Sequence, residues 1–565
     1  MPMSKTEASP DDPDPWRLRT DVVPEWWYAA SESYPDETLI LKDKVSYSFR
    51  EIDTRSAALA RGLLAEGATK GSKIGLLAPN GPEWVIAWLA INRIGGLAVF
   101  LSTFASAAEL GYAVPYADVQ ILIVSETYLR HDYLARLEEG LPGLAEADGK
   151  APLTLAIAPF LRSAWIIGAR RPRWARGSLE DLEARGAASQ EYNAALLAAA
   201  EAQVSTADAA MLIFTSGTTA FPKAVVHTQG TVVRRSLSGR RAMASSTEIE
   251  HGARILLPSP FFWISGMLTL CGAIQRGSCV ICLDDHSPRG VFEAIRDYGA
   301  KYVSGVASVL TPACAAGGEE GPAVMSQLRP MSSHQMAFFD RLADRPPARL
   351  ALALGMTETF GPFSGGSNEE LPPDLPASVG RVLEGWEWKI VDPQTGRTLP
   401  DNEFGELCVR GVFLMDGMYK KERHEVFDAD GYYHTGDGCT LRPDGYLVYG
   451  NRLSGMIKTS GANVSPEEVE VAIRALPDVV DVCVVGVPDP KLGQMVVAAV
   501  VRSPGSTLDE GDVRAQAQAR LSSFKAPKRV LFFEYSDLPR TPSHKIRAPA
   551  LRQMIADMMA NEEKV

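Results

Sequence analysis

The first part of the chain alternates two kinds of segment in a regular order. Between residues 47 and 124, helix-like segments such as FREIDTRSAALARGLLAEG alternate with short apolar runs such as KIGLLAP and LAVFLS. This alternation is typical of a sheet whose parallel strands are joined by crossover helices. The same texture returns around ILLPSP, SCVICL and KYVSGV, without the fixed-period repeat of a solenoid or propeller. The sequence therefore predicts an α/β fold for most of the chain.

A smaller unit of different texture follows at about residue 454. Ser465, Pro466 and Glu468 combine a capping serine, a proline at the first helical position and a glutamate three residues after the cap, which together indicate the start of a helix. Strand-like DVCVVGV and VVAAVV come next, then a helix near 508–521, a strand at RVLFFE and a terminal helix. These segments predict an α+β domain of its own.

The length of the chain requires more than one domain. Its 565 residues exceed the roughly 250–300 at which a single hydrophobic core stops growing. We expect a disordered tail at 1–15, a large N-terminal α/β domain at 16–453 and a small C-terminal α+β domain at 454–565. The tail is acidic and proline-rich without an apolar core, so it does not resemble a signal peptide. The small, polar segment NRLSG supplies the joint between the two domains.

Charge, hydropathy and cysteine usage exclude several classes of protein. The net charge of −12 argues against a nucleic-acid partner held by phosphate neutralisation. The most apolar stretch, 85–101, is interrupted by Asn92 and Arg93 and is too short for a membrane span. Seven scattered cysteines predict reduced thiols and a cytoplasmic protein. Cys279 and Cys282 form a CxxC, but their apolar surroundings favour a buried strand over a metal or redox site.

The segment TSGTTAFPK at residues 215–223 carries the clearest chemistry. It follows the apolar strand MLIF, and its glycine and small hydroxyl residues leave backbone N–H groups and hydroxyls free to surround phosphate oxygens, while Lys223 supplies positive charge. The GK[ST] of a Walker loop is absent. From the residues alone, a Ser/Thr-rich surface turn remains an alternative.

This segment resembles the TSGTTGxPKG signature of the adenylate-forming superfamily, which includes acyl-CoA synthetases, peptide-synthetase adenylation domains and luciferases. The resemblance continues in one order along nearly the whole chain. Its further elements are SYSFREIDTRSAALARGL, APNGPEW, GMTET at 355–359, VGRVLEGWEWKIVD, GELCVRG, YHTGD, NRLSGMIKTSGANVSPEEVE and LPRTPSHKIR. It implies an enzyme that uses ATP, Mg²⁺ and coenzyme A to activate a carboxylic acid, with a C-terminal domain that is mobile.

The resemblance also implies roles for individual residues. The triphosphate would be held by Thr215, Ser216, Gly217, Thr218, Thr219 and Lys223, with Gly355, Met356 and Thr357 beside it. Glu358 would bind Mg²⁺, a hard cation suited to a carboxylate. Asp437 would accept hydrogen bonds from both ribose hydroxyls, with Arg452 supporting the ribose. The alternatives are a surface acid at Glu358 and a simple turn at HTGDG.

Two further implications concern the C-terminal domain. Lys545 corresponds to the catalytic lysine that bridges carboxylate and phosphate during adenylation, the alternative being a solvated surface lysine. In the superfamily the small domain then rotates about a hinge, here Ser454, and Lys458 and Gly461 would border the pantetheine tunnel. A glycine there lets the backbone approach a ligand closely.

The sequence departs from the pattern at several positions. Ala220 and Ala224 stand where the superfamily usually has glycine, and an alanine that needs positive φ costs about 1 kcal/mol. Ser454, His544 and Leu354 also replace more usual residues. In the acid pocket, PxFH reads PFFW and the glycine-rich SGGA segment reads MSSHQM. The predicted pocket comprises Phe262, Trp263, Gly266, Ser333, His334 and Gln335, although Trp263 could instead be a core aromatic.

The leading hypothesis is a carboxylic acid–CoA ligase acting on a hydrophobic, bulky or cyclic acid, with small molecules as its partners and a homodimer as one possible assembly. Two alternatives stay open. One transfers the acyl group to a carrier-protein thiol or an amine, and the other is a nucleotide-binding homologue that has lost catalysis.

Overall fold

The computed structural model describes most of the chain. The described residues are 20–215, 222–238, 249–305, 307–346, 348–366, 370–372, 374–375, 378–453, 455–476, 478–503, 505–534, 536–539 and 546–562. The tail expected at 1–15 and the hinge expected at Ser454 lie outside them. None of the described helices combines the length and the apolar character needed to cross a bilayer.

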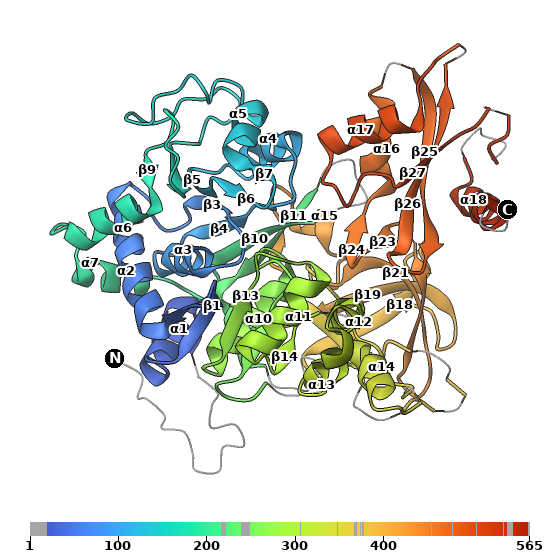
Figure 1. Cartoon of the computed structure of the whole chain (residues 1–565), viewed down its shortest axis with the longest axis horizontal. Helices are drawn as coiled ribbons and strands as arrows, with labels where there is room; N and C mark the ends of the chain where they lie inside the picture. Colours follow the sequence, from blue (N-terminus) through green and yellow to red (C-terminus); the bar gives the residue numbers. More distant parts are fainter. Residues whose placement is uncertain are drawn as a thin grey trace.

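A sheet of eight strands forms the centre of the N-terminal part (Figure 1). The strand order is β20-β11-β10-β4-β3-β5-β8-β9, parallel from β10 to β9 and antiparallel from β10 through β11 to β20. The bounds are β3 (Lys73–Leu77), β4 (Leu97–Phe100), β5 (Ile121–Ser125), β8 (Ser163–Ile167), β9 (Gly177–Ser178), β10 (Ala209–Thr215), β11 (Lys223–Thr228) and β20 (Gly417–Met418).

Helices cover both faces of this sheet, which explains its continuous apolar strands. Along β5, Ile121 and Ile123 pack into one hydrophobic core while Leu122 and Val124 pack into another. The first core includes residues of α2 and α3, and the second includes residues of α4 and α5. The helices of this part are α1 (Val23–Ser33), α2 (Phe49–Ala65), α3 (Pro82–Arg93), α4 (Ala107–Tyr116), α5 (Tyr133–Gly140), α6 (Leu179–Ala188), α7 (Ala194–Glu201) and α8 (Gln229–Leu237); the short strands β6 (Thr127–Tyr128) and β7 (His131–Asp132) pair with each other.

A second sheet, ordered β14-β12-β13-β1-β2, lies beside the first. Cys279 and Cys282 are buried in β13, and burial raises the pKa of the Cys279 thiol to about 12, so the expected buried strand is confirmed. The bounds are β1 (Thr38–Lys42), β2 (Val45–Ser48), β12 (Arg254–Leu256), β13 (Cys279–Cys282), β14 (Tyr302–Val303), α10 (Ile264–Gln275), α11 (Pro288–Tyr298), α12 (Ala307–Ala316), η1 (Gly318–Glu320), α13 (Gly321–Met325) and α14 (Ser333–Leu342).

Antiparallel strands complete the N-terminal part. A three-stranded sheet, β15-β16-β17, is followed by a four-stranded sheet ordered β18-β19-β21-β22. The bounds are β15 (Leu354–Met356), β16 (Gly361–Gly365), β17 (Arg381–Val382), β18 (Trp386–Val391), β19 (Phe404–Gly411), α15 (Arg423–Val426), β21 (Tyr433–Leu441) and β22 (Leu447–Arg452).

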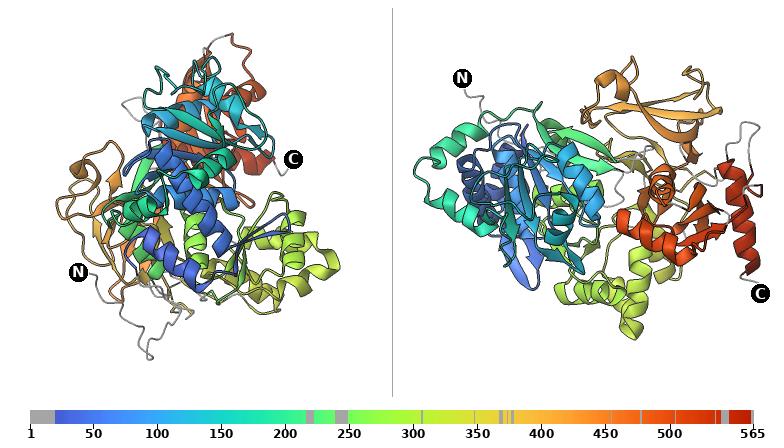
Figure 2. Two further views of the ribbon diagram at one scale, coloured as in Figure 1. Left: turned by 90° about the vertical axis from the view of Figure 1, so that its left-hand side faces the viewer. Right: turned by 90° about the horizontal axis from the view of Figure 1, so that it is seen from above.

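The C-terminal unit, residues 455–562, is the α+β structure that the sequence predicts. Figures 1 and 2 show it, in orange to red, at one side of the molecule. Ser465 caps α16 by accepting a hydrogen bond from the Glu468 backbone N–H, as its spacing predicts. The bounds are β23 (Ile457–Thr459), β24 (Ala462–Val464), β25 (Val479–Asp489), β26 (Gly493–Arg502), β27 (Arg529–Phe532), α16 (Pro466–Arg474), α17 (Glu510–Arg520) and α18 (Ala548–Glu562). The domain boundary at 453/454 stays a prediction.

Candidate active site

The expected phosphate loop joins two neighbouring antiparallel strands. Thr215 ends β10 and Lys223 begins β11, and the two residues are directly opposite each other in the pairing. The hairpin therefore anchors both ends of the loop on the central sheet. Ser216, Gly217, Thr218, Thr219 and Ala220 lie outside the described residues.

Alanine in place of glycine at position 224 does not strain the backbone. Ala224 is buried in β11 and pairs with Phe214 on β10. It is not among the non-glycine residues with positive φ, so the penalty that a left-handed alanine would incur does not arise there. The side-chain environment is apolar, which a methyl group suits better than a glycine hydrogen.

The GMTET motif forms a turn held against the central sheet. His227 on β11 and the Thr357 carbonyl are joined by a hydrogen bond of 2.8 Å through the ring Nε2. Arg235 on α8 donates to the carbonyls of Phe360 and Pro362 just beyond the motif. His227 is fully buried, and that burial lowers its pKa to about 4, so the ring is neutral and its Nε2 carries the proton donated to Thr357.

Gly355 and Met356 lie in β15 at the start of this turn. A Cβ added to Gly355 would lie 2.5 Å from the Gly361 carbonyl oxygen, so only glycine fits this close approach of two strands. Leu354, where the sequence departs from the pattern, is partly buried in the same strand. These positions shape the turn that presents Thr357 and Glu358.

Glu358 links this turn to the YHTGD motif. Its side-chain Oε1 accepts a hydrogen bond of 3.2 Å from the Tyr433 hydroxyl, and its backbone carbonyl accepts one of 2.8 Å from the Met415 N–H. The carboxylate is only partly buried. Two motifs that are 75 residues apart in the sequence thus meet at one carboxylate.

Asp437 lies deep in the same strand as Tyr433. It is 2% exposed, and its backbone N–H donates to the Thr435 hydroxyl, which itself donates to the Leu407 carbonyl. On the neighbouring strand β22, Arg452 is its pairing partner. The HTGD segment therefore lies within strand β21 rather than in an isolated turn, at a point where its pairing with β19 is irregular and Gly436 has φ of +74°. Asp437 and Arg452 are paired in the β21–β22 ladder.

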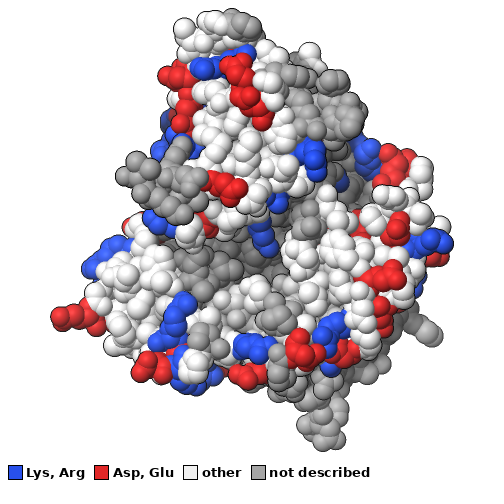
Figure 3. Space-filling model, turned by 90° about the vertical axis from the view of Figure 1, so that its right-hand side faces the viewer, with Lys and Arg blue, Asp and Glu red and all other residues white. Residues whose placement is uncertain are grey.

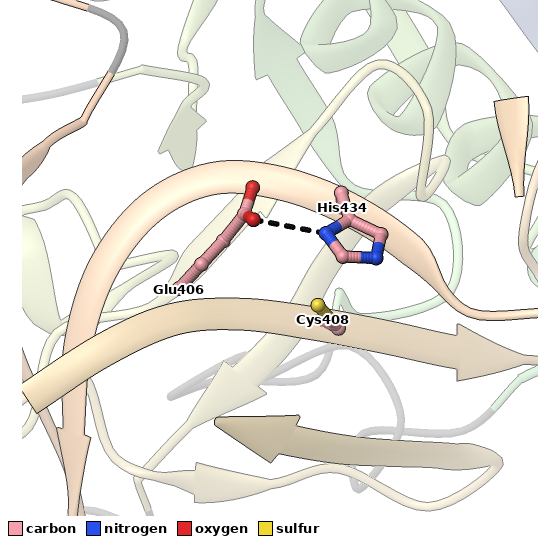
Figure 4. Close-up of side chains that lie close together, drawn as sticks. All are labelled: Glu406, Cys408 and His434. Carbon is pink, nitrogen blue, oxygen red and sulfur yellow. Dashed lines mark hydrogen bonds and ion pairs between the residues drawn. The ribbon is translucent and has the colours of Figure 1, made fainter. Parts of the chain in front are cut away.

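A polar cluster joins this strand, β21, to its neighbour β19. The Nδ1 of His434 lies 2.9 Å from Glu406 Oε2, and Cys408 lies beside both (Figure 4). The other carboxylate oxygen of Glu406 accepts from the Gly436 N–H. Hydrogen bonds to Cys408 and Glu406 raise the pKa of His434 to about 10. We interpret this trio, which the sequence analysis did not single out, as a polar cluster whose His434–Glu406 pair joins β21 to β19.

The predicted acid pocket contains an aromatic group at the start of α10. Phe262 is buried, whereas Trp263 is partly exposed and packs against the main core. Both rings contact Phe104, at centroid distances of 5.9 Å and 5.7 Å. Gly266 packs tightly, because an added Cβ would lie 2.0 Å from the Pro260 carbonyl oxygen. The core-packing alternative for Trp263 remains open, since this residue has both a packed and an exposed part.

The altered MSSHQM segment forms the start of α14. Ser333 is the first residue of the helix. Gln335 uses its amide fully, donating to the Val303 and Gly305 carbonyls and accepting from the Met331 N–H. Burial, with a smaller contribution from the charge of Lys458, lowers the pKa of His334. Gln335 therefore fixes the backbone of this region, while His334 lies close to a residue of the C-terminal unit.

Lys458 and Gly461 occupy the β23–β24 hairpin. Lys458 is on β23 with an exposed side chain, and Gly461 has φ of +81° with open space where a Cβ would be. The charge of Lys458 contributes to the lowered pKa of His334, one of the predicted pocket residues. Lys545 and His544 lie outside the described residues. Figure 3 shows a hollow on the face that carries the C-terminal unit, with Lys and Arg side chains in it and at its edge.

Comparison with known proteins agrees with these features. The putative acyl-CoA synthetase YngI of Bacillus subtilis is 28% identical over 94% of this chain and 96% of its own. A Mycobacterium tuberculosis CoA ligase for a methyl-dioxo-octahydroindenyl propanoyl group is 28% identical over 92% of this chain and 96% of its own. The solved structure of the amide bond synthetase McbA from Marinactinospora thermotolerans matches with a TM-score of 0.74 and 25% identity, covering 94% of this chain and 99% of that one.

Family models cover most of the chain. Residues 468–545 match the AMP-binding enzyme C-terminal domain, which lies within the C-terminal unit. Residues 27–419 match the model described as AMP-binding enzyme, a span that contains the phosphate-loop hairpin and the turn with Thr357 and Glu358. The chain therefore belongs to the AMP-binding enzyme family.

Proposed function

We propose that this protein is an ATP-dependent carboxylic acid–CoA ligase of the AMP-forming type. A carboxylate attacks the α-phosphorus of ATP, giving acyl-AMP and pyrophosphate; the thiol of coenzyme A then attacks the acyl carbon, giving the thioester and AMP. The proposal rests on one observation. The GMTET turn is hydrogen-bonded to the phosphate-loop strand through His227 and to the YHTGD strand through Tyr433.

Each end of ATP has a matching group in this arrangement. Asp437 accepts from the two ribose hydroxyls, a task that suits an ionised carboxylate with two acceptor oxygens, and Arg452 supports the ribose. Lys223 and Thr215, with the hydroxyls of Ser216, Thr218 and Thr219 and the N–H of Gly217, surround the phosphates. Thr357 contacts the phosphate next to the reacting atom, with Gly355 and Met356 shaping its turn.

Glu358 is the residue we assign to Mg²⁺. Its carboxylate is partly exposed in the turn that follows β15, and a hard oxygen donor of this kind suits Mg²⁺. When bound, the cation would neutralise charge on the phosphate oxygens. The hydrogen bond from the Tyr433 hydroxyl to Oε1 holds the Glu358 carboxylate in one orientation. Lys545 supplies further positive charge between carboxylate and phosphate during adenylation.

The acid is a hydrophobic one, and we propose a bulky or cyclic carbon skeleton. The aromatic rings of Phe104, Phe262 and Trp263 suit an apolar group, and Ser333, His334 and Gly266 lie on the elements around them. The relative from Mycobacterium tuberculosis is named for a fused-ring acyl group, which supports the same class here.

The C-terminal unit serves the second half-reaction through its β23–β24 hairpin, which guides the thiol to the acyl group. The effect of the Lys458 charge on His334 supports this assignment. Gly461 leaves open space for pantetheine. Adenylation would need the unit to rotate about Ser454 so that Lys545 reaches the site. A homodimer stays a prediction, to be checked by light scattering.

Pyrophosphate exchange tests the first half-reaction. With a panel of aliphatic, aromatic and fused-ring acids, we expect exchange of labelled pyrophosphate into ATP that needs both an acid and Mg²⁺. Addition of CoA to the accepted acid should give a thioester, separable by chromatography. ATP binding without exchange on any acid would favour the non-catalytic alternative.

The acceptor needs its own comparison, because a structural relative is an amide bond synthetase. CoA, a phosphopantetheinylated carrier protein and simple amines are offered to the same acyl-AMP. We expect CoA to react fastest by at least an order of magnitude. A faster amine or carrier protein would assign the alternative acceptor while leaving adenylation intact.

A further inference from the structure

The C-terminal unit meets the N-terminal part through an aromatic contact. Phe524 lies just after α17, and its ring contacts Phe104 at a centroid distance of 6.0 Å and Trp263 at 6.4 Å, both edge to face. Those two residues belong to the aromatic group of the predicted acid pocket. The ring of Phe524 therefore adds a residue of the C-terminal unit to this aromatic group.

A buried ion cluster holds the same segment in place. Lys525 Nζ lies 2.7 Å from Glu109 Oε1 on α4 and 2.6 Å from Glu468 Oε1 on α16. The three side chains are 8%, 13% and 4% exposed. Glu109 also accepts from the Ser522 hydroxyl, so the N-terminal part holds two residues of the segment that carries Phe524.

The N-terminal part fixes Glu109 independently. Glu109 is the third residue of α4 and its carboxylate accepts from the Ser106 backbone N–H, while the Ser106 hydroxyl donates to the Arg520 carbonyl at the end of α17. Figure 1 shows α17 close to α4. Burial alone would lower the pKa of Lys525, but the two carboxylates outweigh it and raise that pKa, so the lysine is charged in this cluster.

We propose that Phe524 is a specificity-determining residue that the C-terminal unit adds to the acid pocket, and that Lys525 positions it through Glu109 and Glu468. This inference rests on the proposed ligase function. It implies that the acyl group is selected twice: once during adenylation, by the N-terminal residues, and again during thioester formation, when Phe524 closes the pocket beside Trp263.

The test measures the two half-reactions separately on the full chain. Phe524→Leu removes the ring and keeps an apolar side chain. In thioester formation from supplied acyl-AMP and CoA, we expect its kcat/KM ratio for bulky over small acyl groups to shift by 3- to 10-fold. The same ratio in pyrophosphate exchange and the KM for CoA should change less than 2-fold. Phe533→Leu, in the same unit but packed against its own core, is the matched control and should shift nothing.

Positioning by Lys525 has a separate readout. Glu109→Gln removes the negative charge that faces Lys525 and keeps an amide oxygen that can still accept from Ser106 and Ser522. Lys525 remains paired with Glu468, so the variant should fold. It should reproduce the acyl-preference shift of Phe524→Leu, and the double variant should show no larger shift than either single one. Glu109→Asp should restore part of the wild-type preference.

Two results would overturn the inference. One is an unchanged acyl preference in Phe524→Leu together with a raised KM for CoA, which would assign the ring to the thiol passage. The other is a shift equal in both half-reactions, which would make Phe524 a general packing residue. Failure of the proposed function is distinguishable from both, because the wild-type protein would then give neither exchange nor thioester with any acid.

Discussion

The two regions that meet at the site are held together by different kinds of bond. In the N-terminal part, His227 and Arg235 are buried side chains that bond to backbone carbonyls of the GMTET turn and its extension. At the contact with the C-terminal unit, Lys525 bonds to the carboxylates of Glu109 and Glu468, and Phe524 makes edge contacts with two rings.

The bonds to the GMTET turn form a permanent framework, whereas the contact with the C-terminal unit can break and form again. Breaking the bonds to the GMTET turn would leave backbone carbonyls buried without partners, at about 1–3 kcal/mol each, so the turn stays where it is. The charged groups of the interface can instead be hydrated when the two regions separate, and interdomain contacts of this kind commonly allow motion. The residues that we propose for ATP are thus on the framework, and Lys545, Lys458 and Gly461, which we assign to a single half-reaction, belong to the C-terminal unit.

Lys545→Ala should have the largest effect, and it should affect only one of the two half-reactions. If the lysine reaches the site only for adenylation, pyrophosphate exchange should fall by roughly 10²–10³, the effect of losing one transition-state donor. Thioester formation from supplied acyl-AMP should remain near the wild-type rate.

The opposite pattern is expected from Gly461→Leu, which fills the space beside the hairpin and should slow thioester formation while leaving exchange largely intact. Equal damage to both steps in each variant would contradict an exchange of the C-terminal unit between two positions.

Asp437→Ala tests the framework itself. Loss of two charge-assisted hydrogen bonds to the ribose should weaken ATP binding by about 2–3 kcal/mol, measured by calorimetry. Both half-reactions should suffer, because AMP is held in each. An unchanged dissociation constant would mean that the ribose is bound elsewhere, and Asp444→Ala, an exposed acid beyond the same strand, serves as the control.

His227 predicts how the framework responds to acid. Its pKa of about 4 in the folded protein lies below the ordinary 6.5, so the unfolded chain binds the proton more tightly. Stability should therefore fall as the pH drops through 6.5 and level off near 4, with a contribution of about 2 kcal/mol by pH 5.

His227→Gln keeps a donor but does not titrate, so the loss of stability from pH 7 to pH 5 should be smaller by about that amount in urea denaturation. His434→Gln is the contrasting variant, because the raised pKa of His434 stabilises the folded protein at low pH and loses that effect as the pH rises towards 10. Equal acid sensitivity of wild type and His227→Gln would show that the pKa of His227 is the same in the folded and the unfolded protein.

Trp263→Ala should give the smallest effect and the most selective one. Removing the ring should favour bulkier acids over small ones by several-fold in pyrophosphate exchange while ATP affinity is unchanged. A uniform loss across the acid panel would support the core-packing alternative.

Local sequence patterns predicted much of this structure. The alternation of helix-like and apolar segments predicted the central sheet, and the capping signals at Ser465 and Pro466 predicted the start of α16. The resemblance assigned Asp437 and Arg452 to the ribose, and that assignment stays a prediction. Whether Ala224 needs a positive φ was left open, because residue identity does not reveal that the position is a regular strand.

The contacts between distant segments could not be predicted in this way. Lys525 and Glu109 are 416 residues apart. The Ser106-x-x-Glu109 spacing is that of a helix cap, which gives no sign of a partner in the C-terminal unit. His227 bonds to a carbonyl, a group that every residue has, so its sequence offers no sign of the partner. The pairing of Phe524 with Trp263 depends on the orientation of the C-terminal unit, which is a property of the fold rather than of any local segment.

The hydrogen bond between Tyr433 and Glu358 has a consequence for how ligands act on one another. Tyr433 lies on the same strand as Asp437, so the proposed ribose site and the proposed cation site share one rigid element. We expect occupation of either site to restrain that element and so to favour the other ligand, and thermodynamic reciprocity requires the two effects to be equal in size. Adenosine alone, which has ribose hydroxyls but no phosphate, should therefore raise the affinity for Mg²⁺, and Tyr433→Phe should reduce that linkage while leaving each separate affinity nearly intact.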